Sequence, residues 1–267
     1  MMGSFKTINK EIMKKISHEA PLQLLQKSRI FNDYDYALVH LFEQSEEYFD
    51  FFKMSLKLGR EVILDNSVFE LGEAYDSKKY CKWIDKLQPT YFVIPDKFCD
   101  MEVTIDNVKK WHTYPGKKMG VIQGNTLEEF KQCYEEIEPL VDKVAISFAQ
   151  PLFEKLFPIL DKDVARVFGR IYLINYLLVN NVINKDKDHH LLGASLPQEF
   201  ICYRHSSYDF IKTIDTSSPV LHGLLGVRFK EYGLKQKVKT KMADIFFDDI
   251  KNEKLVEYNI KIMRTFL

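Results

Sequence analysis

Short apolar runs recur along the whole chain, and each is followed by a stretch with helical periodicity. Seven runs are clear and an eighth is weaker: they are 36–42, 61–66, 91–96, 118–124, 143–148, 189–195 and 210–215, with 11–17 as the weaker one. The runs are almost continuously apolar and end in polar residues or glycine, which is typical of parallel strands covered on both faces. We therefore expect eight parallel strands.

The segments between the runs have the spacing of helices. We expect helices at 45–58, 77–88, 103–112, 126–138 and 162–182, a short one at 197–204 and a last amphipathic one at 240–265. The long interval between 143 and 189 has room for additional helical structure. Eight βα units in a domain of this length predict an α/β fold, a closed (β/α)₈ TIM barrel over residues 1–267 as a single domain. An open doubly wound sheet is the alternative.

Composition excludes several classes of protein. The 267 residues include 38 Lys plus Arg and 38 Asp plus Glu, so the formal net charge is zero and a uniformly basic nucleic-acid-binding surface is excluded, although a local basic patch is not. No run of 18 apolar residues is present, so no membrane span is expected. The N-terminus lacks the apolar core of a signal peptide, and we expect a cytoplasmic location.

Metal ligands in a recognisable arrangement are missing from the sequence. The four cysteines are far apart and form no CxxC pair, which argues against structural zinc and against a disulfide framework. His189 and His190 are adjacent on an expected strand, so their side chains point to opposite faces and do not form a pair of ligands. We expect neither a metal nor a cofactor.

Polar residues follow the expected strands at their carboxyl ends, where ligands bind in both architectures. Asp65, Asp96, Gln123 and Asp215 follow four strands, and the small residues Gly193–Ser195 follow a fifth. An Asp at a strand end is often only a turn former or helix cap. Several at one barrel mouth favour a site in which one carboxylate attacks or stabilises a sugar centre and another moves a proton.

The order of these motifs resembles the tRNA-guanine transglycosylase family, including its shorter relatives that act on DNA in phage and bacterial deazaguanine modification systems. The segment DNSVF, residues 65–69, stands where that family has a DSGGF-type motif, and Asp96 in VIPD stands where an Asp reads the guanine edge. GVIQG at 120–124 matches a GxVQG motif, GASLPQE at 193–199 a GGLxxGE motif, and IDTSSP at 214–219 an FDxxxP nucleophile motif. The resemblance covers about 36–225.

The resemblance implies the exchange of a guanine for a 7-deazaguanine through a covalent glycosyl-aspartate intermediate. Asp215 is then the nucleophile and Asp65 the acid or base. The remaining roles fall to the base pocket: Phe69 stacks on the base, Asp96 accepts from its N–H groups, and Gln123, Gly124, Gly193, Ala194 and Ser195 read the carbonyl side. The implied partners are a free base (guanine or a preQ0-like 7-deazaguanine) and a polynucleotide, with a homodimer as one option and the host cytoplasm as the location if a phage encodes the chain.

The departures from the family bear on the acceptor. The zinc ligands of the tRNA enzymes are missing, which favours DNA over tRNA, and Ala194 replaces the second glycine of the base-binding loop. An Arg expected after Pro219 is absent, and His222 and Arg228 are candidates for phosphate contacts, a solvated loop being equally consistent. The basic run from Lys230 to Lys241 could contact nucleic acid, although such runs are usually solvated surface.

Two other functions remain open. One is a barrel N-glycosidase or nucleoside hydrolase that uses Asp65 or Glu70 together with Asp215. The other is a non-catalytic barrel that binds nucleic acid as a subunit. An exchange enzyme needs a free base and a polynucleotide, a hydrolase needs one substrate, and a binding subunit needs neither Asp.

Overall fold

The computed structural model describes residues 14–111 and 114–267, and its strands form one parallel sheet. They are β1 (Lys15–Ser17), β2 (Asp35–Leu38), β3 (Val62–Asp65), β4 (Tyr91–Val93), β5 (Lys117–Val121), β6 (Lys143–Ser147), β7 (Asp188–Leu192) and β8 (Ile211–Asp215). Spatial order follows the chain, with β1 beside β8 at one end and β2 at the other. The Asp33 backbone N–H donates to Ile16 O at 3.0 Å, so the segment before β2 reaches β1. The eight strands thus form a nearly closed barrel, which confirms the (β/α)₈ fold.

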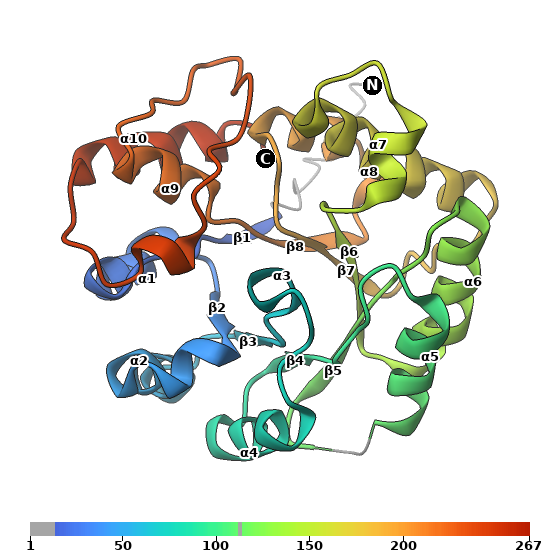
Figure 1. The fold of residues 1–267 in the computed structure, drawn as a ribbon, viewed down its shortest axis with the longest axis horizontal. Helices are drawn as coiled ribbons and strands as arrows, with labels where there is room; N and C mark the ends of the chain where they lie inside the picture. Colours follow the sequence, from blue (N-terminus) through green and yellow to red (C-terminus); the bar gives the residue numbers. More distant parts are fainter. Residues whose placement is uncertain (1–13, 112–113) are drawn as a thin grey trace, which may run out of the picture.

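Helices surround the strands (Figure 1). They are α1 (Leu25–Phe31), α2 (Glu46–Lys57), α3 (Val68–Leu71), α4 (Ser77–Leu87), α5 (Met101–Lys110), α6 (Leu127–Ile137), α7 (Pro151–Leu156), α8 (Lys162–Val179), α9 (Ser218–Leu224) and α10 (Glu253–Arg264). The side chains of Ser45, Asp76, Asp100 and Thr126 each accept a hydrogen bond from a first-turn backbone N–H, which satisfies a donor that the helix leaves unpaired. In the described residues no helix is long and apolar enough to cross a membrane.

The helices expected at 45–58, 77–88, 126–138 and 162–182 are confirmed to within a few residues, and α7 occupies the long interval after β6. The segment 197–204 is a 3₁₀ helix, η4 (Pro197–Tyr203). The strand expected at 11–17 is present as β1, and the helix expected at 103–112 is present as α5; residues 11–13 and 112 lie outside the described residues.

The prediction of a single helix over residues 240–265 is wrong. The chain forms only a short 3₁₀ turn, η6 (Met242–Ile245), and helix α10 begins at Glu253. Asn252 has a φ of +58°, which a helix interior does not allow. The Phe246 ring lies 5.2 Å from the Tyr48 ring on α2, so tertiary packing directs this segment across the barrel instead of into a helix.

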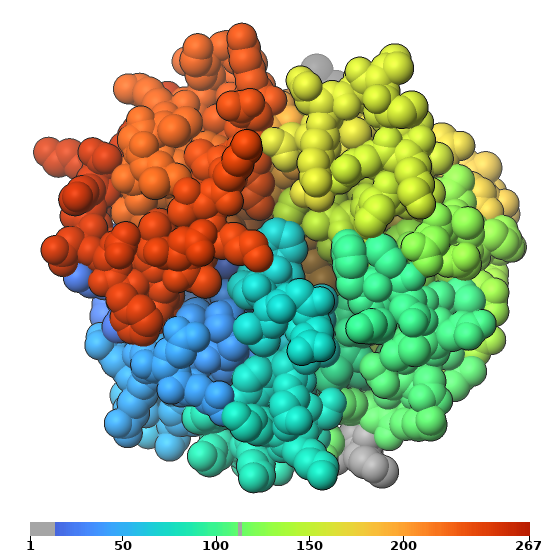
Figure 2. Space-filling view, viewed as in Figure 1, coloured from blue at the N-terminus to red at the C-terminus, as the bar shows by residue number. Residues whose placement is uncertain are grey.

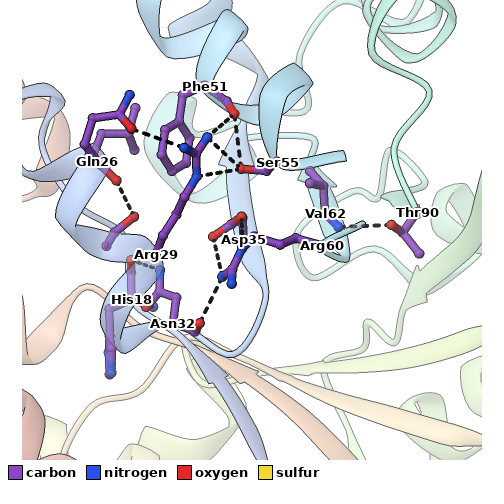
Figure 3. A network of polar contacts seen from close by, with 12 residues as sticks. His18, Gln26, Arg29, Asn32, Asp35, Phe51, Ser55, Arg60, Val62 and Thr90 are labelled. Atoms are coloured by element: carbon purple, nitrogen blue, oxygen red, sulfur yellow. Dashed lines mark hydrogen bonds and ion pairs between the residues drawn. The ribbon is translucent and has the colours of Figure 1, made fainter. Parts of the chain in front are cut away.

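A polar network closes the amino-terminal end of β2 and β3 (Figure 3). Arg60 donates to both carboxylate oxygens of Asp35, at 2.7 and 3.0 Å, and to Asn32 O at 2.9 Å. Nearby, Thr90 Oγ1 accepts from the Val62 backbone N–H at 3.0 Å. These groups lie at the opposite end of the strands from Asp65, so they stabilise the barrel and leave its other end for binding.

Candidate functional site

A cavity of about 1010 Å³ opens at the carboxyl ends of the strands. Figure 2 shows a hollow where the orange, yellow and cyan parts of the chain meet. The cavity is lined by seven of the residues that the sequence singles out: Asp65, Phe69, Asp96, Gln123, Gly193, Ala194 and Asp215. Segments far apart in the chain therefore contribute to one site, as the carboxyl ends of barrel strands do.

Asp215 ends β8 and is 4% exposed in the cavity wall. Its Oδ1 accepts hydrogen bonds from His190 Nε2 at 2.9 Å and from the Gly193 backbone N–H at 3.0 Å. Among the described residues, none donates a hydrogen bond to Oδ2. These two contacts fix the orientation of the side chain, so Asp215 presents a held carboxylate with one oxygen available to react.

His190 lies behind Asp215 and was not identified from the sequence. Its ring stacks on Tyr36 with the centroids 5.8 Å apart, and its Nδ1 lies 2.8 Å from Thr213 Oγ1. Burial lowers the pKa of His190, and the charge of Asp215 opposes this shift only in part. The neutral ring then donates from Nε2 to Asp215 and accepts at Nδ1 from the Thr213 hydroxyl.

The two histidines do point to opposite faces of β7. Whereas His190 faces the barrel interior, His189 Nε2 lies 3.0 Å from Tyr134 Oη on α6. The alternation of side chains along a strand could therefore have identified His190 as an inward-facing residue, but only the pairing of β7 with β8 places it against Asp215.

Besides Asp215, five carboxyl groups line the cavity, and four of them have raised pKa values. Burial, followed by the charges of Glu70 and Asp215, raises the pKa of Asp65 well above its ordinary value. Burial also raises the pKa of Asp96, of Glu19 and of Glu70, the last to about 7. Glu19 follows β1 and belongs to no motif recognised in the sequence. Carboxyl groups with raised pKa values in the same cavity as the oriented Asp215 are suited to acid–base chemistry.

We predict that Glu70→Gln stabilises the protein more at high pH than at low pH. The folded pKa of about 7 exceeds the ordinary 4.5, so the folded state binds the proton more tightly and wild-type stability falls as pH rises from about 4.5 to 7. Gln removes this loss. Urea unfolding at pH 5 and pH 8 should show a difference between the variants that grows by on the order of 1–3 kcal/mol at pH 8. A difference independent of pH would contradict the assignment.

Asp96 and Gln123 form a fixed polar edge of the cavity. Asn66 Nδ2 donates to Asp96 Oδ1 at 2.8 Å, and Gln123 Nε2 donates to Asp96 Oδ2 at 2.6 Å. Gln123 Oε1 in turn accepts from Cys99 N and from Gln150 Nε2, both at 3.1 Å. Each Asp96 oxygen can accept another hydrogen bond, and Gln123 keeps one N–H to donate. This edge can therefore bind a ligand that carries both donors and acceptors.

Phe69 provides an exposed aromatic face beside this edge. It is 47% exposed, lines the cavity, and lies 5.6 Å from the ring of Phe148. The preceding loop is tight because Asn66 Oδ1 accepts from Val68 N at 3.1 Å and Ser67 has a φ of +61°. The DSGGF-type motif has glycine at the position of Ser67, a residue that adopts this φ most readily.

The backbone conformation and the close packing at position 193 require glycine. It has a φ of +64°, and a Cβ there would lie 2.5 Å from the Phe148 ring. Ala194 follows it and lines the cavity. The other two small residues are placed elsewhere: Ser195 Oγ donates to Asp163 Oδ1 at 2.9 Å, and a Cβ on Gly124 would lie 2.9 Å from Phe130 N on α6. Neither Ser195 nor Gly124 is among the cavity-lining residues.

The expected phosphate contact of His222 is wrong. The side chain is fully buried on α9, where Nδ1 donates to Ser218 O at 2.7 Å and Nε2 accepts from Val238 N at 3.3 Å. Both ring nitrogens are therefore used within the protein. Arg228 is exposed and stacks over the Tyr258 ring at 3.8 Å, away from the cavity-lining residues, and its phosphate contact stays a prediction.

The rim of the cavity contains residues of the basic run. Lys237, Lys239 and Lys241 line it, together with Lys162 and Arg166 at the start of α8. Lys239 and Lys241 are exposed and Lys237 is partly buried, so these three lysines line the cavity while remaining accessible to solvent.

In residues 14–111 and 114–267, no group of three or more His, Cys, Asp or Glu side chains is arranged to hold a metal ion. A comparison of the sequence with protein-family models gives no match, and a comparison with curated proteins gives no significant match.

Proposed function

We propose that this protein exchanges a guanine base of a polynucleotide for a 7-deazaguanine through a covalent intermediate on Asp215. The observation that carries the proposal is the placement of Asp215. Its carboxylate is oriented by His190 and Gly193 in the wall of a cavity that also holds the protonatable Asp65. An oriented carboxylate in one cavity with a second carboxyl group of raised pKa is the arrangement that double displacement at a sugar requires.

The first displacement begins when Asp215 attacks the anomeric carbon. The glycosidic bond to guanine breaks, and its electron pair leaves with the base, which takes the proton of Asp65. The product is a glycosyl ester of Asp215. In the second displacement Asp65, now ionised, removes a proton from the incoming base, whose nitrogen attacks the same carbon and releases the Asp215 carboxylate. The glycosyl ester conserves the free energy of the broken glycosidic bond, so no energy-rich cofactor is needed.

The rest of the cavity fits a flat purine-like base. Phe69 and Phe148 offer aromatic faces, and Asp96 with Gln123 offers acceptors and one donor at the ring edge. Asp96 is suited to the N–H groups of a guanine edge and the free Gln123 N–H to its carbonyl. A base must leave the helical stack to reach such a pocket, and the cavity of about 1010 Å³ has room for it.

DNA is the acceptor that we favour, since the sequence lacks the Cys and His zinc ligands of the resembled tRNA enzymes, whose zinc subdomain helps to hold tRNA. The test is incorporation of labelled guanine, and separately of a labelled preQ0-like 7-deazaguanine, into duplex DNA and into tRNA. Label in DNA supports the full proposal, and label only in tRNA corrects the acceptor. The absence of label from both, with folded protein and both bases, would refute base exchange.

A glycosidic hydrolase is the second candidate, and Glu70 is the observation that favours it. This carboxyl group lines the same cavity as Asp215, and its pKa of about 7 suits a base that activates water. A hydrolase would release guanine from the polynucleotide without added free base and leave abasic sites. Chromatography of the supernatant, with and without free base, distinguishes the two reactions.

We predict that His190→Phe lowers the rate of exchange by roughly 10²-fold while leaving the binding of the polynucleotide within about twofold. Phe keeps the stacking on Tyr36 but removes the N–H that orients Asp215. The decrease should therefore appear in kcat and not in KM. His190→Gln, which can still donate to Asp215, should recover part of the rate. An equal loss in both variants would mean that His190 serves only packing.

A further inference from the structure

We propose that Lys237, Lys239 and Lys241 bind the phosphodiester backbone of the polynucleotide whose base enters the cavity. The inference rests on the proposed function and extends it to the grip on the substrate. The three lysines occupy alternate positions of a segment without helix or sheet pairing, and all three line the cavity rim. The name "lysine rim" is used below for these three residues.

Two of these lysines border the aromatic faces on which the base is proposed to stack. Lys237 Nζ lies 4.5 Å from the Phe148 ring centroid, and Lys241 Nζ lies 5.4 Å from that of Phe69. Lys241 Nζ also donates to Phe69 O at 3.4 Å. A nucleotide stacked on Phe69 would thus have its sugar and phosphates close to two ammonium groups.

The ammonium groups of the lysine rim are not used in ion pairs within the described residues, so they can pair with the negative charges of a ligand. Within the described residues, no carboxylate lies within ion-pair distance of its three ammonium groups, whereas the other rim cations are engaged: Arg166 and Lys162 both pair with Glu154, at 3.0 and 3.5 Å. Residues 226–241 contain six Lys or Arg and only one acidic residue in a chain of zero net charge. Three of these six cations, the lysine rim, lie where the cavity opens.

Side-chain hydrogen bonds hold the backbone of this segment in place. The Gln198 side chain bonds both the N–H and the C=O of Leu234, at 3.1 and 2.7 Å. Asp163 Oδ2 accepts from Lys237 N at 2.7 Å, and His222 Nε2 accepts from Val238 N at 3.3 Å. His222 thus supports the lysine rim from beneath instead of contacting phosphate itself. A rim fixed in this way loses little conformational entropy when a ligand binds.

The cavity itself explains why such a rim is needed. Its lining contains Glu19, Asp65, Glu70, Asp96, Asp163 and Asp215, and each of these groups that is ionised opposes the approach of a polyanion. Cations at the mouth offset this repulsion and keep the phosphates outside while an uncharged base enters. Phosphate contacts of this kind position a polynucleotide without reading its sequence.

The test measures binding of the full-length chain to a labelled 20-base-pair A·T duplex that contains no guanine, by fluorescence anisotropy over a range of salt. Lys237→Gln, Lys239→Gln and Lys241→Gln are combined in one variant. The matched control combines Lys57→Gln, Lys82→Gln and Lys261→Gln, three exposed lysines that do not line the cavity. Thermal melting confirms that both variants fold.

We expect the rim variant to bind roughly 10- to 100-fold more weakly at 0.1 M salt, with the slope of log K against log salt reduced by about 2 to 3. The control should stay within about twofold. The triple Lys→Arg rim variant should bind like the wild type, since it keeps the charges. Equal losses in the rim and control variants, or an unchanged slope in the rim variant, would overturn the proposal.

Competition experiments in the same assay identify which phosphate-containing ligand the lysine rim binds. Competition by single-stranded DNA and by RNA, but not by millimolar inorganic phosphate at equal ionic strength, supports a polymer backbone and ranks the two polymers. Complete displacement by inorganic phosphate would overturn the proposal in favour of a site for a small anion. Because the duplex lacks guanine, its binding does not depend on base exchange: loss of rim-dependent binding with intact exchange refutes only this inference, and the reverse refutes only the proposed function.

Discussion

Asp215→Asn is expected to lower base exchange by roughly 10⁴-fold or more, because the amide cannot form the glycosyl ester. Asn has the same shape as Asp, and the His190 and Gly193 donors that hold Oδ1 can hold the amide oxygen at the same place. The variant should therefore fold and bind the polynucleotide like the wild type. Incorporation of labelled base into DNA measures the rate.

The same variant should also remove the covalent intermediate. Wild-type protein mixed with guanine-containing DNA and no added base is expected to form an adduct that survives denaturing electrophoresis, and mass spectrometry should place it on the peptide that contains Asp215. Asp85→Asn, an exposed change on α4, is the matched control and should leave both rate and adduct unchanged. Substantial exchange by Asp215→Asn would exclude Asp215 as the nucleophile, whatever else the cavity does.

The barrel could be predicted because its strands are buried on both faces, and such strands have continuous apolar runs. The helices with caps or long apolar stripes could be predicted for a similar reason: Asp76 and Thr126 cap α4 and α6 through their own side chains. The segment 240–252 could not, because its path depends on contacts such as Phe246 with Tyr48, which lie nearly 200 residues apart in the chain.

The same distinction, between local pattern and long-range contact, separates the site residues that could be predicted from those that could not. Residues at the ends of strands, such as Asp65 and Asp215, could be predicted to lie in one site because the carboxyl ends of barrel strands meet. His190 required the strand register that places it near Asp215, and the lysine rim required bonds such as Asp163 to Lys237. His222 was assigned from its position after the nucleophile motif, but sequence position alone does not show that α9 buries it.

Disrupting the buried ion pair next to the Gly193 loop is expected to cause a large loss of folding stability. Arg170 on α8 and Glu199 on η4 are both essentially unexposed, and Arg170 Nε lies 2.6 Å from Glu199 Oε1. Arg170 also donates to Leu192 O and Gly193 O, both at 3.0 Å. The pair thus holds the loop that orients Asp215. Arg170→Leu would leave the Glu199 carboxylate and these carbonyls without their partner, and should lower the free energy of unfolding by about 3–5 kcal/mol.

Urea unfolding at pH 7 measures this loss, and a double-mutant cycle shows its origin. Arg166→Leu, one turn earlier on α8, removes a partly exposed pair with Glu154 and should cost about 1 kcal/mol or less. Arg170→Leu combined with Glu199→Leu should be less destabilised than the sum of the single changes, because no buried charge then remains unpaired. The double variant should still exchange bases poorly, since the Gly193 carbonyl has lost its donor and the Gly193 N–H no longer holds Asp215 firmly. A cost for Arg170→Leu within 1 kcal/mol of that for Arg166→Leu would mean that the loop is held by packing around Phe148 and Gly193 instead of by the ion pair.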